Sequence, residues 1–232
     1  MKVVHVISAP AAGGAEIYVK DLCKSLSNHS IETHILFLNH AKDVGRSAEF
    51  ENKFIAELDE ARINYSFIGH EARKNPLLGA IRVKRFVTKN SIDLYHSHLT
   101  HGIFGGALLN IPRAYTHHNW GMRVPKLAHK GLDLILERYI GISDICSRNL
   151  SEYAGKPVTT IKNGVPPGRL LNNRHERQLP LGEINCLAIG RISEQKNYSL
   201  LIDAISLVPK KIRRRLKISI AGEGEKNLEK KL

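Results

Sequence analysis

Two cations, Arg191 and Lys196, follow an apolar segment of strand length and are well suited to hold an anion. Residues 187–189 predict a buried parallel strand, Gly190 the turn after it, and residues 197–208 the next helix. Open α/β sheets bind ligands in loops at the carboxyl ends of their strands. Because a guanidinium grips phosphate bidentately and an ammonium acts as a mobile point charge, the pair suits a diphosphate. The alternative is two solvated loop residues.

A small-residue loop near the start of the chain is a second candidate site. Residues 2–8 predict a strand, and Gly13 and Gly14 lead from it into a helix. Glycines at such a turn let backbone N–H groups approach a phosphate or a sugar at the positive end of the helix. A tight turn without a ligand explains the same residues, because Glu16 in the first helical turn is favourable for the helix dipole alone.

Histidines gather after two further predicted strands, at residues 92–95 and 113–116. They are His96, His98, His101, His117 and His118, with Asn119 next to the last. A His-x-His pair can ligate zinc, but residues 96–101 and 117–120 contain no cysteine or carboxylate to support a metal. Neutral histidine can donate and accept hydrogen bonds with sugar hydroxyls and phosphates. We therefore expect these residues to line a ligand cleft without a metal.

The remaining segments predict how these residues are positioned. Strands at 33–38, 64–68, 138–142 and 158–161 alternate with helical segments, a pattern typical of a parallel sheet with crossover helices. Ser143 and Asp144 predict a helix start. Residues 166–182 lack periodicity and predict a linker. A strand, a helix, a strand at 216–221 and a short charged helix follow it.

A basic amphipathic helix is predicted at residues 75–90. Its apolar residues are Leu77, Leu78, Ile81 and Phe86, and its cations are Arg82, Lys84, Arg85 and Lys89. Such a helix can lie on an anionic membrane, or it can simply pack its apolar face on a sheet.

Composition narrows the functional classes. The 232 residues carry a net charge of +13, which favours nucleic acid, anionic membranes or phosphorylated ligands as partners. No aromatic residue interleaves the basic run at 210–217, which argues against single-stranded nucleic acid bound by base stacking. A run of this kind is usually a solvated helix end, and we expect no nucleic-acid partner. The three cysteines form no paired framework, which fits a reducing compartment. The apolar run at 3–7 is short and broken by His5, so it does not predict a secretory signal. No apolar run reaches the ~18 residues of a spanning helix. We expect a cytoplasmic protein whose membrane contact, if any, is peripheral.

Five motifs together resemble glycosyltransferase family 4. They are Gly13-Gly14-Ala15-Glu16, Asp93-Leu-Tyr-His-Ser-His98, Asn163-Gly164-Val165, Gly190-Arg191-Ile192 with Lys196-Asn197, and Ile220-Ala-Gly222-Glu-Gly224. They occur in family order over almost the whole chain. The resemblance implies an α/β GT-B fold of two Rossmann-like domains: an acceptor-side domain at 1–165 and, after the linker, the incomplete start of a donor-binding domain at 183–232. Pro166 stands where the family usually has an aspartate.

The resemblance also implies an activity. Family members transfer a sugar from a nucleotide-sugar donor, such as a UDP- or GDP-sugar, to a glycan or lipid-linked acceptor with retention, generally without a metal or other cofactor. Cell-surface polysaccharide or glycolipid synthesis at the inner face of the membrane is the expected setting. Arg191 and Lys196 would neutralise the leaving diphosphate, and His118 would face the transferred sugar. The implied substrate-binding residues are Gly13, Gly14, Glu16, His98, Asn119, Asn163, Gly190 and Gly222.

Three alternatives stay open. The chain could be a non-catalytic sugar- or anion-binding module, a nucleotide-sugar epimerase, or, on charge alone, a nucleic-acid binder. The family's Glu-x7-Glu element, which holds the donor's ribose and sugar, has no counterpart after Gly224. We therefore expect weak nucleotide binding and almost no turnover from these 232 residues.

Overall fold

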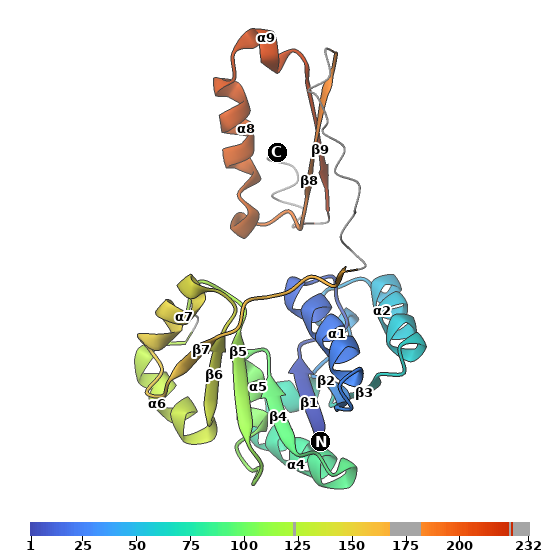
Figure 1. Ribbon diagram of the computed structural model, residues 1–232, viewed down its shortest axis with the longest axis vertical. Coiled ribbons are helices and arrows are strands. Elements are labelled where there is room, and N and C mark those ends of the chain that lie inside the picture. Colours follow the sequence, from blue (N-terminus) through green and yellow to red (C-terminus); the bar gives the residue numbers. More distant parts are fainter. Residues whose placement is uncertain (123, 168–181, 223, 225–232) are drawn as a thin grey trace. The chain divides into compact units, whose positions relative to one another are not determined.

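The computed structural model describes residues 1–122, 124–167, 182–222 and 224. The chain divides into two compact units, Met1–Leu170 and Leu171–Leu232 (Figure 1). Most of the linker predicted at 166–182 lies outside the described residues. Within the described part of the chain, no helix is long and apolar enough to cross a membrane.

Unit 1 is built on a seven-stranded parallel sheet in the order β3-β2-β1-β4-β5-β6-β7. The strands are β1 Lys2–Ile7, β2 Glu32–Phe37, β3 Asn64–Phe67, β4 Leu94–Ser97, β5 Arg113–His117, β6 Arg138–Gly141 and β7 Val158–Thr160. The chain moves outward from β1 to β3 and then returns to β4 on the other side of β1. Such a reversal is the topological switch point at which open α/β sheets bind ligands. The α/β fold expected from the sequence is confirmed.

Helices connect these strands. They are α1 Gly14–Ser27, η1 Lys42–Val44, α2 Ala48–Glu60, α3 His70–Lys74, α4 Pro76–Asn90, α5 Thr100–Gly105, α6 Lys126–Ile135 and α7 Asp144–Ser151. Side-chain oxygens of Ser47, Asn75 and Ser143 accept hydrogen bonds from the first turns of α2, α4 and α7. Each cap satisfies backbone donors that have no partner inside the helix. The helix start predicted at Ser143 is confirmed.

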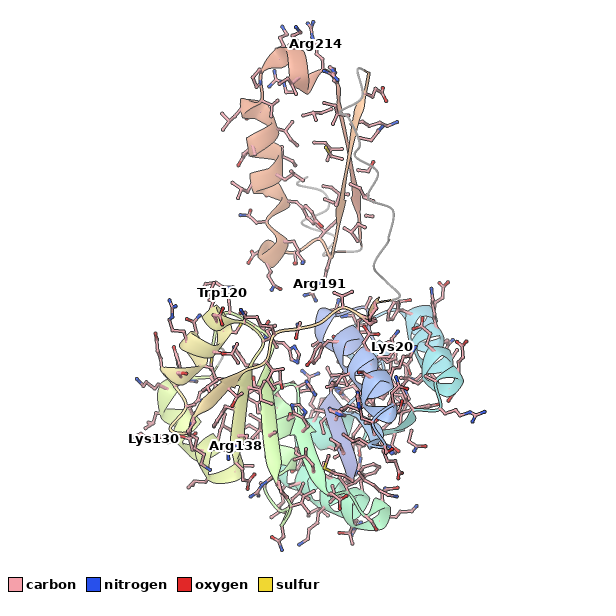
Figure 2. All side chains as sticks on the ribbon, in the orientation of Figure 1. Lys20, Trp120, Lys130, Arg138, Arg191 and Arg214 are labelled. Atoms are coloured by element: carbon pink, nitrogen blue, oxygen red, sulfur yellow. The ribbon has the colours of Figure 1, made fainter. Side chains whose placement is uncertain are left out.

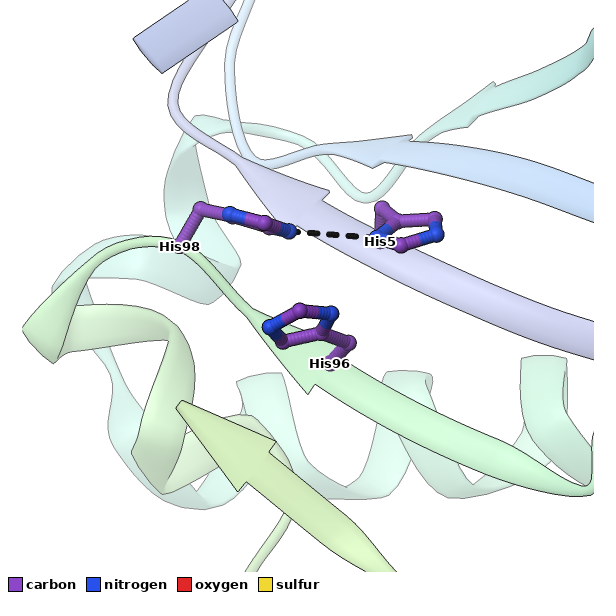
Figure 3. A group of neighbouring side chains, drawn as sticks. All are labelled: His5, His96 and His98. Atoms are coloured by element: carbon purple, nitrogen blue, oxygen red, sulfur yellow. Dashed lines mark hydrogen bonds between the residues drawn. The ribbon is translucent and has the colours of Figure 1, made fainter. Parts of the chain in front are cut away.

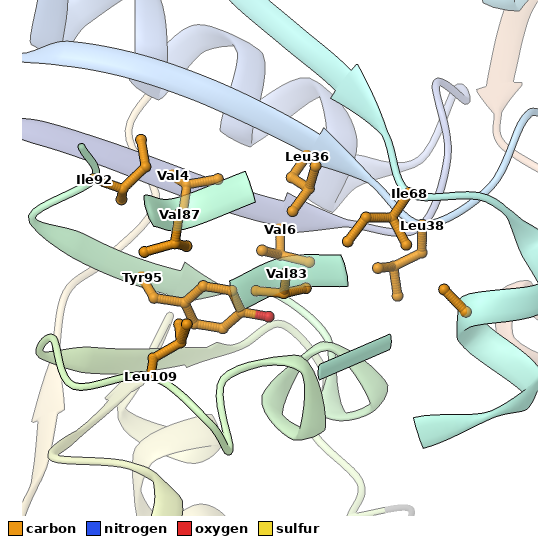
Figure 4. Packing of buried hydrophobic residues seen from close by; sticks show 11 residues of the cluster. Val4, Val6, Leu36, Leu38, Ile68, Val83, Val87, Ile92, Tyr95 and Leu109 are labelled. Atoms are coloured by element: carbon orange, nitrogen blue, oxygen red, sulfur yellow. The ribbon is translucent and has the colours of Figure 1, made fainter. Parts of the chain in front are cut away.

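The two faces of the sheet pack against different helices. Val4 and Val6 of β1 pack against Val83 and Val87 of α4 (Figure 4). Ile7, on the opposite face, belongs to a cluster with residues of α1 and α2. Because side chains alternate along a strand, His5 shares the face of Ile7 and points to the side of the sheet that carries α1. On this face His5 lies next to His96, its partner in the register of β1 with β4 Leu94–Ser97.

The apolar face predicted for α4 was wrong in part: Phe86 packs against the core, but it is not among the fully buried residues. The buried residues of this helix are Gly79, Ala80, Val83 and Val87, whereas Leu77 is 65% exposed. A β-carbon at Gly79 would lie 2.6 Å from the carbonyl oxygen of Ala72, so the small residue lets α4 approach α3. Close approach through glycine, rather than the largest side chains, therefore determines which face is buried.

Unit 2 contains one β-α-β arrangement among its described residues. The parallel strands β8 Ile184–Ile189 and β9 Leu216–Ala221 are joined through η3 Glu194–Lys196, α8 Tyr198–Leu207 and α9 Lys210–Arg213. The prediction that β8 is buried was wrong, because Leu187 is 62% and Ile189 76% exposed. In the described part of this unit, the two-stranded sheet leaves these side chains uncovered. The charged helix predicted at the end of the chain lies outside the described residues.

Candidate functional site

The switch point of unit 1 places histidines from two strands side by side. His5 of β1 and His96 of β4 are direct partners in the parallel register. His98 follows His96 by two residues, so strand alternation turns its side chain to the same face. All three side chains are buried and lie together (Figure 3). Strand order therefore joins residues that are separated by more than ninety positions in the sequence.

Three of the histidines form a hydrogen-bonded row. Nδ1 of His5 lies 3.1 Å from Nε2 of His98, and Nδ1 of His98 lies 2.9 Å from Nε2 of His118 (Figure 3 shows the first contact). His118 is only half-buried, whereas His5 and His98 are buried. The row thus leads from the interior of the sheet to its rim. Two of the histidines expected to line one cleft, His98 and His118, are therefore in contact at this edge of the sheet.

His96 stands beside this row. Its Nε2 is 2.7 Å from Oγ1 of Thr116, and its ring centroid is 4.2 Å from that of His98. One nitrogen from each of His5, His96 and His98 falls within 4.8 Å of the other two, a spacing that a metal ion could bridge. These three residues are the ones that could hold a metal in this part of the chain, and imidazole is a suitable ligand for zinc.

Burial keeps this cluster uncharged at neutral pH. Burial lowers the pKa of His5 to about 4 and that of His118 to about 4. The pKa values of His96 and His98 are also lowered well below the usual value, first by burial and then by the neighbouring histidines. A buried cation would lose its hydration, and each histidine would repel a second charge. The cluster therefore acts as a set of neutral donors and acceptors.

The start of α1 forms the neighbouring wall of the site. The ring of Tyr18 lies edge-on to His118, with centroids 5.4 Å apart. Gly13 is the N-cap of α1, and a β-carbon there would collide with the Glu16 carboxylate. Nothing lies within 4 Å of the corresponding position on Gly14. The carboxylate of Glu16 thus occupies the positive end of α1, which favours a neutral sugar over a phosphate as the group bound there.

Some of the predicted site residues do not join the cluster. The structure corrects the predicted strand ends, because β4 and β5 include His96 and His117. His117 turns to the opposite face, where its Nδ1 contacts the hydroxyl of Tyr115 at 2.9 Å. His101 lies exposed in α5. Asn119, after β5, and Asn163, after β7, are also exposed.

The predicted anion site of unit 2 lies at the carboxyl ends of β8 and β9. A β-carbon on Gly222 would collide with the carbonyl oxygen of Gly190, so the two loops touch through their glycines. The hydroxyl of Tyr198 donates to the same carbonyl at 3.0 Å. The stem of Lys196 packs over Gly190, with Cε 3.3 Å from the position of a β-carbon there. Arg191 is exposed at this end of the unit (Figure 2).

Three residues of the cluster were not predicted from the sequence. His5 is a single polar residue in an apolar strand, and its place is evident only once β1 lies next to β4. Tyr18 comes one turn after Gly14 in α1, a spacing that could have indicated it. Thr116 ends the predicted strand next to His117, and its hydrogen bond to His96 depends on strand register.

A family comparison covers most of unit 1. The sequence model described as Glycosyltransferase Family 4 matches residues 12–169. The chain belongs to glycosyltransferase family 4. It is also 24% identical, over its whole length, to the capsular polysaccharide biosynthesis glycosyltransferase CapH of Staphylococcus aureus, and it spans 64% of the length of that relative.

Solved structures of known proteins share the fold of this family member. Sucrose-phosphate synthase from Thermosynechococcus elongatus matches with a TM-score of 0.70 at 14% identity, over 98% of this chain and 63% of the other. A glycosyltransferase from Rickettsia africae matches with a TM-score of 0.65 at 16% identity, over 95% and 68%. At these identities the likeness shows the GT-B fold alone, and it agrees with the fold expected from the sequence.

Proposed function

We propose that this chain is part of a glycosyltransferase that moves a sugar from a nucleotide-sugar donor to a glycan or lipid-linked acceptor with retention. The observation that carries the proposal is the loop after β8, where Arg191 and Lys196 accompany two touching glycines. Loss of a diphosphate leaving group builds negative charge on phosphate oxygens. Fixed cations stabilise such charge, and electrostatic stabilisation of this kind usually lowers the barrier more than any other single effect in catalysis.

The proposed roles follow from the chemistry of each residue. Arg191 grips phosphate oxygens bidentately, and Lys196 follows the charge as the glycosidic bond breaks. The backbone of Gly190 and Gly222 allows close approach of the nucleotide. No metal and no other cofactor takes part in the proposed reaction, because these side chains supply the positive charge.

The acceptor is proposed to bind at unit 1. His98 binds its polar groups together with Gly13, Gly14 and Glu16 at the start of α1, and His118 orients the transferred sugar. The exposed amides of Asn119 and Asn163 offer further donors and acceptors. Support comes from the place of the histidine row at the switch point of the sheet and from CapH, whose name refers to capsular polysaccharide biosynthesis.

The nucleotide class is tested by ligand-observed NMR. UDP, GDP, UMP and inorganic pyrophosphate are added separately to the 232-residue chain. We expect binding signals from UDP or GDP and weaker ones from UMP. Pyrophosphate should compete with the bound nucleotide, because the diphosphate supplies most of the attraction. Equal signals from UMP and the diphosphates would contradict a diphosphate site. In a transfer assay, retention is read from the anomeric configuration of the product.

A basic groove on unit 1 favours an anionic membrane as a further partner, on the cytoplasmic face. The groove measures about 540 Å³ and lies along α4 and the segment after α5. Its lining residues are Ile81, Lys84, Arg85, Thr88, Lys89 and Leu108. Apolar walls with cations beside them fit a lipid whose chain enters the groove and whose phosphate meets the cations. Each cation near an anionic surface contributes about 1 kcal/mol.

Vesicle sedimentation tests this contact. Changing Lys84, Arg85 and Lys89 together to Ser should weaken binding to phosphatidylglycerol vesicles by about two orders of magnitude. Arg82 is kept, because it donates to the carbonyl of Ile68 at 2.8 Å and supports the fold. A matched variant with Lys210, Lys211 and Arg214 changed to Ser should bind as the unaltered chain does. An equal loss of vesicle binding in both variants would show that the chain binds through general charge attraction and not through this groove.

A further inference from the structure

The row His5–His98–His118 has a limited number of proton arrangements. A neutral imidazole carries one ring proton, so the three rings carry three. Each of the two nitrogen–nitrogen contacts, at 3.1 and 2.9 Å, requires one proton between its atoms. The third proton must therefore sit at an end of the row, on Nε2 of His5 or on Nδ1 of His118. The first arrangement places all three protons on Nε2 atoms, and the second places them all on Nδ1 atoms.

The two ends of the row differ in their surroundings. Nε2 of His5 is buried and has no hydrogen-bond partner among the described residues. His118 is half-buried at the rim, and in the described part of the chain its Nδ1 has no partner either. An orphaned N–H is rarer in protein interiors than an acceptor with no donor, and its desolvation is costly. The buried end therefore favours a bare nitrogen, and the rim favours the N–H.

We infer that His5 and His98 are positioning residues that hold the third proton on Nδ1 of His118, so that His118 presents an N–H donor to the ligand. The atom it faces is then an acceptor, such as a hydroxyl oxygen of a sugar or an oxygen of a phosphate. This inference deepens the proposed function and rests on it only for the identity of that ligand. The proton arrangement itself is a property of the free protein.

The surroundings of the row support the neutral arrangement. The groups that face it are His96 and Thr116 on the sheet and Tyr18 on α1. Burial lowers the pKa of His5 and His98, and the further contributions at His98 come from other histidines. Tyr18 is also neutral, since burial raises its pKa. No charged side chain is needed to explain these shifts, so each ring keeps a single proton at neutral pH.

Long-range proton–nitrogen NMR on the histidine-labelled chain tests the inference at pH 7.5, without any ligand. We expect His5, His98 and His118 each to carry the proton on Nδ1. The tautomer of His118 with its proton on Nε2 should be about tenfold less populated, because that arrangement leaves an N–H at Nε2 of His5 without a partner. Protons on the Nε2 atoms would overturn the inference. Because this spectrum needs no variant, it decides the matter even if a substitution prevents folding.

Substitutions separate a positioning role from simple packing. His5→Phe removes the donor to His98. The ratio of Nδ1-protonated to Nε2-protonated His118 should then fall by about tenfold. His5→Asn keeps an amide N–H near the former Nδ1 and should restore the ratio. His96→Phe is the matched control, since His96 is buried beside the row but outside it. A fall in His96→Phe as large as that in His5→Phe would overturn the inference.

Zinc is the competing interpretation, and the same experiment includes it. One equivalent of zinc chloride is added and the chain is then desalted. Retention of one zinc per chain, with metal-shifted nitrogens at His5, His96 and His98, would make the cluster a metal site and overturn the inference. If all three histidines carry the proton on Nδ1 but the chain binds neither UDP nor GDP, the inferred proton arrangement is supported and only the proposed nucleotide-sugar donor is refuted.

Discussion

Acid should destabilise unit 1 in the range between pH 7 and pH 5, well above the titration of ordinary carboxylates. Burial lowers the pKa of His5 from 6.5 to about 4. The unfolded chain therefore binds a proton in this range that the folded chain does not bind. Stability rises with pH wherever the unfolded state holds more protons, so it must fall as the pH is lowered from about 6.5 towards 4.

The size of the effect follows from the same two pKa values. At pH 5 the unfolded imidazole is almost fully protonated and the folded one almost fully neutral. The linkage relation then gives a loss of about 2 kcal/mol for His5 alone, relative to pH 7. His5 is 1% exposed, so solvent screening does not reduce this figure. His96 and His98 shift in the same direction and add to the loss.

Urea unfolding followed by far-ultraviolet circular dichroism measures this loss. The unaltered chain is compared at pH 7 and pH 5 with His5→Phe and His101→Ala. The difference between the two pH values should shrink by about 2 kcal/mol in His5→Phe, because the group that titrates is gone. It should stay the same in His101→Ala, since His101 is exposed. Equal stability of the unaltered chain at both pH values would refute the assignment of a buried, neutral cluster.

Two further predictions concern the packing of unit 1, and urea unfolding checks both. The Lys20 side chain is 4% exposed and pairs with Glu57, which is 34% exposed (Figure 2 labels Lys20). Glu57→Gln should lower the free energy of unfolding by about 3 kcal/mol, because it leaves a buried ammonium without its partner. Lys20→Met should lower it by less than about 1 kcal/mol. The reverse order would contradict this account of the pair. Gly79→Ala should cost about 1–3 kcal/mol, because the added β-carbon would collide with the carbonyl of Ala72. Gly131 is an exposed position of α6 with nothing within 4 Å, so Gly131→Ala should stabilise unit 1 by roughly 0.5–1 kcal/mol. Equal effects of the two substitutions would contradict the close approach of α3 and α4.

The order of strands and helices could be predicted because short strand-like segments alternate with longer helical segments along the chain. Helices α3, α5 and α6 were not predicted. The first two are five and six residues long, too short for a helical repeat to stand out. The apolar face of α4 was also missed, since its burial depends on the close approach that Gly79 allows.

The candidate site could be predicted in part. His98 and His118 were expected together because both follow parallel strands, whose carboxyl ends meet at one edge of a sheet. The row they form depends on His5, and no local pattern indicates which strand lies next to β4. Contacts between Gly190 and Gly222 likewise depend on the pairing of β8 with β9. Pairing and register are properties of the folded chain and determine which side chains meet.

The central claim is that the loop after β8 holds the diphosphate of a nucleotide sugar, and isothermal titration calorimetry with UDP and GDP tests it most directly. Arg191→Ala should weaken binding of the preferred nucleotide by about tenfold or more, since a charge-assisted pair to phosphate is lost. Arg214 lies at the opposite end of the same unit (Figure 2), and Arg214→Ala should bind as the unaltered chain does. Unchanged binding in Arg191→Ala, or equal weakening in both variants, would contradict the proposed site.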